Sequence, residues 1–66
     1  MKLTINGKKH SLTKCITVMD LIVRKKLDHK SIVIEYNGKI LSKKQISTTR
    51  LKENDLVEII SFVGGG

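Results

Sequence analysis

The chain has 66 residues, of which 13 are lysine or arginine and 6 are acidic, so it carries a formal net charge of +7 at pH 7. A chain of this length forms one small domain and buries only about 60% of the surface that it exposes when unfolded, which excludes a two-domain enzyme and leaves little room for a deep catalytic cleft. Hydrophobic residues make up 39% of the chain, but no apolar stretch approaches the roughly 20 residues of a membrane helix, so we expect a globular domain without membrane contact.

The first predicted element is a β-hairpin. Leu3 and Ile5 alternate with polar residues, which is the period-two pattern of a half-buried strand. Asn6 and Gly7 follow and can both adopt positive φ, as a type I′ turn requires. Residues 8–12 are therefore expected to return antiparallel to the first strand.

A helix is predicted over residues 18–26. Thr17 is its expected N-cap, and Asp20 lies three positions later, near the positive end of the helix dipole. The apolar residues that follow recur at helical spacing and form one face for packing; they are Val18, Leu21 and Ile22.

A second hairpin follows the helix. Residues 32–36 are rich in β-branched side chains and predict a strand, Asn37 and Gly38 supply another turn, and residues 39–41 form a short partner strand. Residues 42–50 are polar, and we expect them to be irregular, with Ile46 as an isolated apolar residue.

Residues 56–63 are the longest strand candidate. Their apolar residues fall at both odd and even positions, which favours a strand at the centre of a sheet. The order β-β-α-β-β-β predicts the α+β class, with one helix packed across one face of a mixed four- to five-stranded sheet. If the first and last strands are neighbours in its middle, this is the β-grasp fold.

The end of the chain is its most unusual feature. Three of the five glycines occupy positions 64–66, directly after the last predicted strand. A frayed terminus or a leftover linker has the same composition. However, three extended residues without Cβ atoms reach roughly 10 Å and can enter a narrow channel. We therefore interpret residues 1–63 as the domain and residues 64–66 as a flexible tail, whose terminal carboxylate is a substrate group for another protein.

No pattern in the chain indicates a catalytic or metal site. Cys15 has no Cys-x-x-Cys partner and is interpreted as a small apolar or exposed thiol, while His10 and His29 lack metal-ligand spacing. One cysteine excludes an intramolecular disulfide, and the N-terminus does not resemble a secretory signal. These observations predict a cytoplasmic protein.

The charged residues leave two questions open. The basic residues form short clusters, but Tyr36 and Phe62 are the only aromatic residues, which are few for stacking on nucleic acid, so a solvated surface is favoured. Glu53, Asp55 and Glu58 gather beside the last strand and form either a solvated turn or a docking surface. Phe62 is either a core residue or an anchor for a partner.

Four segments resemble the ThiS family of thiamin-biosynthesis sulfur carriers, small β-grasp proteins related to ubiquitin. They span nearly the whole chain, and the most specific is the last; they are residues 3–7, 17–22, 32–40 and 55–66. Asn54-Asp55 stands where Gly-Asp is frequent in the family, and Ser42 and Ile46 replace its common Pro and Trp.

The resemblance implies that the protein is a co-substrate rather than an enzyme. A ubiquitin-activating-type (ThiF-like) adenylyltransferase would adenylate Gly66 with MgATP, sulfur from a persulfide donor would displace AMP to leave a thiocarboxylate, and a ThiG-like thiazole synthase would receive that sulfur. Gly64 and Gly65 would thread the partner active sites, with Phe62, Val63 and Glu58 docking at their mouths. The resemblance implies no bound cofactor and a monomer when free.

Three other functions compete with this interpretation. A molybdopterin-type sulfur carrier uses the same chemistry, but those chains are usually longer and often carry a proline before the diglycine, and this chain has no proline. A ubiquitin-like modifier would form an isopeptide bond instead. A small basic nucleic-acid-binding module would use the charge and leave the tail idle.

Overall fold

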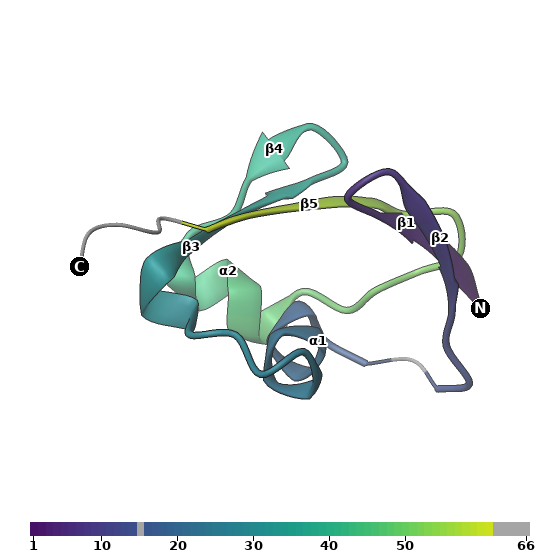
Figure 1. Ribbon diagram of the computed structural model, residues 1–66, viewed down its shortest axis with the longest axis horizontal. Coiled ribbons are helices and arrows are strands. Elements are labelled where there is room, and N and C mark those ends of the chain that lie inside the picture. The colour runs from purple at the N-terminus through teal and green to yellow at the C-terminus, as the bar shows by residue number, and fades with distance from the viewer. Residues whose placement is uncertain (15, 62–66) are drawn as a thin grey trace.

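The computed structural model describes residues 1–14 and 16–61, with the backbone alone at His29. They form a single sheet with two α-helices on one side of it (Figure 1). The elements are β1 (Lys2–Ile5), β2 (Lys8–Ser11), α1 (Val18–Arg24), the 3-10 turn η1 (His29–Ser31), β3 (Ile32–Tyr36), β4 (Lys39–Ile40), α2 (Lys43–Thr48) and β5 (Leu56–Ser61).

The sheet has five strands in the order β2-β1-β5-β3-β4. β1 and β5 run parallel at its centre, and the remaining pairs are antiparallel. This confirms the predicted mixed sheet with the first and last strands side by side. The boundary expected after residue 63 lies outside the described residues, so the division into domain and tail stays a prediction.

Both predicted hairpin turns are present. Asn6 and Gly7 have φ angles of 50° and 79°, and Asn37 and Gly38 have φ angles of 48° and 88°. Two consecutive positive φ angles are what a type I′ turn needs, because its twist matches that of the flanking strands.

Helix α1 begins as predicted and ends earlier. The Thr17 side chain accepts a hydrogen bond from the Asp20 backbone N–H, and the Asp20 carboxylate accepts one from the Thr17 backbone N–H, both at 3.1 Å. The helix was expected to reach Lys26, but that residue has φ 58° and Leu27 N–H donates to the Ile22 carbonyl. This is a Schellman ending with lysine in the left-handed position that glycine usually takes.

Residues 42–50 were expected to be irregular, but they contain the helix α2. Ser42 and Gln45 form a capping box in which each side chain accepts from the other's backbone N–H. Ser-x-x-Gln is a helix-start signal that the polar composition of this stretch concealed. Ile46 faces inward from α2 and is 4% exposed, so the isolated apolar residue is a core residue.

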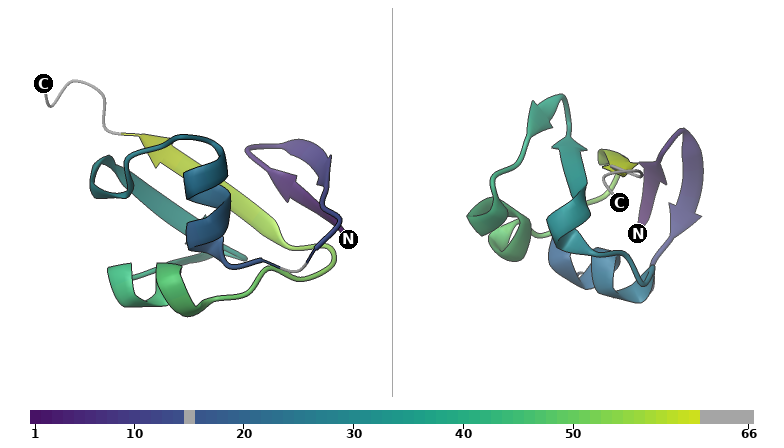
Figure 2. Two further views of the ribbon diagram at one scale, coloured as in Figure 1. Left: turned by 90° about the horizontal axis from the view of Figure 1, so that it is seen from below. Right: turned by 60° about the vertical axis from the view of Figure 1, so that its left-hand side comes forward.

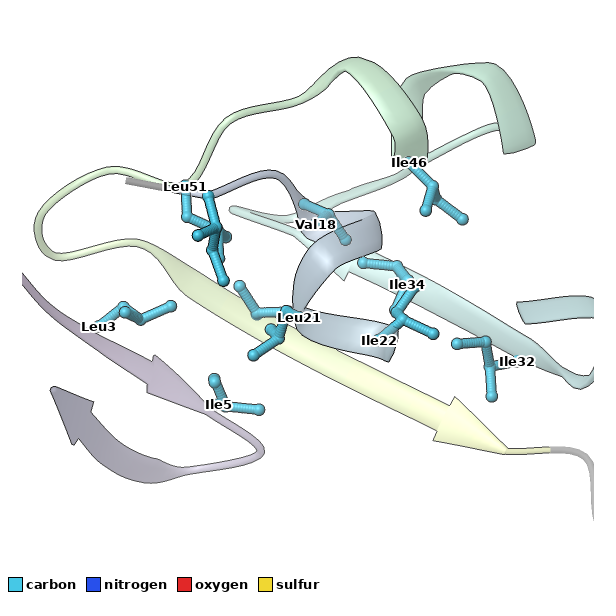
Figure 3. Packing of buried hydrophobic residues seen from close by; sticks show 11 residues of the cluster. Leu3, Ile5, Val18, Leu21, Ile22, Ile32, Ile34, Ile46 and Leu51 are labelled. Atoms are coloured by element: carbon cyan, nitrogen blue, oxygen red, sulfur yellow. The ribbon is translucent and has the colours of Figure 1, made fainter. Parts of the chain in front are cut away.

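The core lies between α1 and the sheet (Figure 3). Figure 2 shows α1 crossing the face of the sheet. Its buried side chains belong to one cluster with those of β1 and β3. Leu51 closes the core from the segment before β5 and is fully buried. The cluster consists of Leu3, Ile5, Ile16, Val18, Leu21, Ile22, Ile32, Ile34, Ile46, Leu51 and Val57.

The opposite side of the sheet, which we call the outer face, has no helix over it (Figure 1). β5 is central, but its two sets of apolar residues have different surroundings. Val57 is 1% exposed beneath the helices, whereas Leu56 and Ile60 are 58% and 51% exposed. The prediction that this strand lies at the centre of the sheet is confirmed, but only one of its two faces is covered, because both helices lie on the same side of the sheet. None of the helices in the described part of the chain is long and apolar enough to cross a membrane.

Candidate functional site

The predicted functional residues lie on β5 and beyond it. Phe62, Val63 and the glycines at positions 64–66 lie outside the described residues, and their proposed roles stay predictions. Glu58 lies on β5 and is exposed on the outer face. The structure therefore shows how the strand that leads to the tail is held.

β5 is paired on both sides. β3 pairs with it along its whole length, from Tyr36 opposite Val57 to Ile32 opposite Ser61. β1 pairs with its first two residues, and the Val57 carbonyl also accepts from the Asn6 backbone N–H at 2.9 Å. The chain consequently runs toward residue 62 from a strand whose last described residue is still part of the sheet.

The two turn asparagines also bind β5 with their side chains. Asn6 Oδ1 accepts from the Ile59 N–H at 2.7 Å, and Asn37 Oδ1 accepts from the Leu56 N–H at 2.8 Å. The Asn6 contact satisfies a backbone donor beyond the point where β1 ends. Asparagine at these turns was predicted for its positive φ alone, so these contacts to β5 were missed.

Asp55 lies directly before β5 and is 4% exposed. Its carboxylate accepts hydrogen bonds from Tyr36 Oη at 2.5 Å, from Asn37 Nδ2 at 3.1 Å and from the Lys52 backbone N–H at 2.6 Å. Burial, together with the Asp55 hydrogen bond and charge, raises the pKa of Tyr36 to about 12. This network ties the β3–β4 turn to the start of β5.

The three acidic residues near β5 do not form one cluster. Glu53 lies in the preceding turn and accepts from the Lys2 N–H at 3.1 Å, and Asp55 is buried. Glu58 alone lies on the outer face, directly opposite Glu35 of β3. The solvated-turn interpretation is therefore wrong for Asp55, because Tyr36 and Asn37, which are distant in sequence, enclose it.

Asn54 has φ 68°, the left-handed conformation that glycine adopts without strain and that asparagine tolerates better than most residues. Its backbone N–H donates to the Lys2 carbonyl at 2.7 Å. This geometry suits an asparagine at the position where the resemblance to the family leads us to expect glycine.

A concavity on the outer face lies between β1, β2 and β5 and is lined by Lys2, Leu3, Thr4, Lys9, Asn54 and Leu56. Its side chains are basic, amide, hydroxyl and apolar. Across residues 1–14 and 16–61, no three His, Cys, Asp or Glu side chains are grouped so that they can hold a metal ion. His10 lies on β2 opposite Leu3 of β1. Cys15 and the His29 side chain lie outside the described structure. The described residues therefore offer a partner an exposed surface.

Comparison with known proteins gives a consistent result. The family model of the ThiS family matches residues 3–66. The sulfur carrier protein ThiS of Bacillus subtilis is 35% identical over 65 residues, which cover 97% of this chain and 98% of that protein. The crystal structure of the thiamine biosynthesis protein ThiS from Geobacter metallireducens superposes with a TM-score of 0.84 at 32% identity and covers 100% of both chains.

A third relative is much longer. A thiazole synthase of Paramagnetospirillum magneticum is 32% identical over 66 residues, and this chain spans only 20% of that enzyme's length. The match to the Geobacter structure also confirms the predicted β-grasp class, with α2 as an addition to the single predicted helix. With the family model and a relative of equal length in agreement, the chain belongs to the ThiS family.

Proposed function

We propose that this protein is a sulfur carrier of thiamin biosynthesis and that it carries sulfur as a thiocarboxylate on Gly66. The observation that carries the proposal is the family match over residues 3–66, which includes the glycine tail, together with full-length similarity to a sulfur carrier protein ThiS. Membership of that family makes the protein a carrier that other enzymes act on rather than an enzyme itself.

The tail has the chemistry that this role needs. A carboxylate is a poor acyl donor until one of its oxygens attacks the α-phosphorus of MgATP in the partner's active site, which releases pyrophosphate and forms an acyl adenylate. The terminal sulfur of a persulfide then attacks the acyl carbon and AMP leaves. A thiol reduces the resulting acyl disulfide and frees the thiocarboxylate. Gly64 and Gly65 present no side chain to obstruct either approach.

We further propose two enzymes as partners: a ubiquitin-activating-type adenylyltransferase that charges Gly66, and a thiazole synthase that accepts the sulfur. Support for the second comes from the thiazole synthase that contains a segment similar to this whole chain. Joining two proteins in one chain raises the effective concentration of one for the other, which is useful where the two act together. The need for MgATP and free thiols places the carrier in the cytoplasm.

The described structure supports a carrier in a physical way. β5 is fixed by β1, β3 and the side chains of Asn6 and Asn37, so the strand leading to the tail is rigid on the body side. A partner that binds the outer face beside β5 therefore meets the start of the tail at a fixed position. We expect Phe62 and Val63 to complete that contact.

The test is the mass of the intact protein. The protein is incubated with a purified adenylyltransferase of this type, MgATP and a persulfide source, and its C-terminal peptide is then analysed by mass spectrometry. We expect one oxygen to be replaced by sulfur at Gly66, and no change in a variant that lacks Gly66. The Bacillus subtilis carrier, treated in parallel, verifies that the enzyme is active. If that carrier gains sulfur and this protein does not, the proposal is wrong.

A further inference from the structure

The two Asn-Gly pairs of the chain, Asn6-Gly7 and Asn37-Gly38, are chemically labile as well as turn formers. In such a pair the backbone nitrogen of the glycine attacks the side-chain carbonyl carbon of the asparagine, ammonia leaves, and a succinimide ring forms. Water then opens the ring at either carbonyl. The product is an aspartate or an isoaspartate, whose main chain runs through the former side-chain carbon. Glycine permits the attack because no side chain stands beside its nitrogen.

The two glycines do not distinguish the pairs. Gly7 and Gly38 have φ angles of 79° and 88°, and both are exposed. A Cβ atom placed on either glycine would meet nothing within 4 Å, so neither turn prevents the ring from forming by crowding. Any difference in reactivity therefore comes from what holds the asparagine side chain.

The Asn37 side chain is held at both ends of its amide. Oδ1 accepts from the Leu56 N–H at 2.8 Å, and Nδ2 donates to the Asp55 carboxylate at 3.1 Å. The second bond is the stronger kind, because its acceptor is a carboxylate that is only 4% exposed. To bring its carbonyl carbon to the Gly38 nitrogen, the side chain must give up both contacts. Asp55 would then lose one of its donors while still buried, which is costly.

The Asn6 side chain is held at one end only. Oδ1 accepts from the Ile59 N–H at 2.7 Å, and Nδ2 donates to no residue within 1–14 and 16–61. This contact is exposed, so water takes over the hydrogen bond when the side chain turns away. The reactive conformation therefore costs less at Asn6 than at Asn37.

The lengths of the hairpins favour the opposite order. β1 and β2 are joined by four residue pairs, whereas β3 and β4 are joined by two, so the second turn opens more readily along its strands. However, Asn37 is bound to the start of β5 by three hydrogen bonds, which are the two from its side chain and one from its backbone N–H to the Leu56 carbonyl at 2.8 Å. None of the three involves β4, so they persist when β4 separates.

We propose that Asn6 is a site of spontaneous modification in the folded protein, and that Asp55 protects Asn37, which lies in the same dipeptide. An aspartate at position 6 leaves the fold intact, because its carboxylate still accepts from the Ile59 N–H. An isoaspartate adds one methylene group to the main chain of a two-residue turn, so the type I′ geometry and the bond to Ile59 are lost. β1 pairs with only the first two residues of β5, so this modification frees the rest of the strand on that side. The inference concerns the fold alone and does not depend on the proposed function.

One digest measures both sites. Trypsin places Asn6 in the peptide of residues 3–8 and Asn37 in that of residues 31–39, so mass spectrometry follows the loss of each amide separately. The full chain is incubated at neutral pH, folded or in urea, and a zero-time sample corrects for conversion during digestion. In urea we expect similar rates, because the dipeptide is the same. In the folded protein, after division by the rates in urea, Asn6 should react about tenfold faster than Asn37, because Asn37 must also break a charged hydrogen bond.

Two matched variants test the roles of the amides. Asn37→Asp removes a donor from Asp55 and places a second carboxylate beside it, so its urea midpoint should fall, whereas Asn6→Asp should keep the wild-type midpoint. The isoaspartate form at position 6, separated by chromatography, should unfold at lower urea than Asn6→Asp.

Four results would overturn the inference. Equal normalised rates at the two sites, or a faster rate at Asn37, show that Asp55 gives no protection. Amides that react in urea and are both inert in the folded protein show that Asn6 is not a site. Equal losses of stability in Asn6→Asp and Asn37→Asp show that the two amides have the same role. An isoaspartate form as stable as Asn6→Asp shows that the modification does not affect β5.

Discussion

Asp55 determines how β5 begins, through hydrogen bonds that its side chain accepts from three other residues. It is 4% exposed and accepts hydrogen bonds from Tyr36, Asn37 and the Lys52 backbone. A buried carboxylate with several donors is stable where an unpaired one would be costly. Sequence alone left Asp55 either in a solvated turn or on a docking surface, because two of the donors that enclose it, Tyr36 and Asn37, come from the distant β3–β4 hairpin.

The burial of Tyr36, together with its hydrogen bond to Asp55, predicts an observable titration. The chain has one tyrosine and no tryptophan, so the absorbance of tyrosinate reports Tyr36 alone. We expect a midpoint at about 12 in the folded protein, compared with 10.0 for an unperturbed tyrosine. A midpoint at the unperturbed value would show that Tyr36 is neither buried nor bonded to Asp55 in solution as the structure has it.

The same shift affects stability at high pH. The folded protein holds the tyrosine proton more tightly than the unfolded chain does. The stabilisation that protonated Tyr36 contributes is therefore complete below pH 10.0 and is lost as the pH rises through about 12. In urea unfolding, the stability difference between the wild type and Tyr36→Phe should shrink over this interval. A constant difference would contradict the prediction.

At the scale of elements, α2 shows why composition was misleading between residues 42 and 50. The segment is polar because a six-residue helix on the side of a small domain buries only one residue, Ile46. Its capping box supplies hydrogen bonds to the first turn, and Ile46 fixes it to the core. Six residues are too few for a recognisable apolar repeat, so the helix start signal was the only usable indication.

The role of Ile46 can be measured against that of Ile40. Both are isoleucines, but Ile46 is 4% exposed and Ile40 is 68% exposed. Ile46→Val removes one buried methyl group and should lower the free energy of unfolding by about 1 kcal/mol. Ile40→Val should change it by less than about 0.5 kcal/mol, because it lies on the surface. Urea denaturation of both variants checks this, and equal losses would contradict the placement of α2 against the core.

At the scale of the whole molecule, the hydrophobic core lies apart from the outer face and from the tail that we propose carries sulfur. Every buried hydrophobic residue of the described chain lies between Leu3 and Val57, and all of them lie on the helix side of the sheet. Leu56 and Ile60 lie on the other side and add nothing to that core. A carrier built in this way can present its surface and tail to enzymes without disturbing its own packing.

Deletion of residues 64–66 tests this separation. We expect the free energy of unfolding to change by less than about 0.5 kcal/mol, since no described core residue lies beyond Val57. Sulfur transfer to the protein should be abolished, because the acceptor carboxylate no longer reaches the partner's active site. Urea denaturation and intact mass are measured on the same preparation. A large loss of stability would show that the tail belongs to the folded body.

The local sequence determined the two type I′ turns, the start of α1, the identity of most strands and the unusual tail. These features depend on residues that are neighbours in the chain, such as Asn-Gly pairs, a capping residue or alternating side chains, and neighbours impose their geometry without help from the rest of the fold. The family resemblance came from the same local segments.

Only the tertiary structure decided which apolar residues of β5 are core and which are surface, since both sets alternate correctly in sequence. Leu56 and Ile60 are exposed because a single helical layer covers one side of the sheet, and Val57 is buried beneath that layer. The burial of Asp55 and the pairing of Glu35 with Glu58 likewise depend on strand register between segments about 20 residues apart. Register is a property of the assembled sheet, because every strand pair must agree on one common inner face.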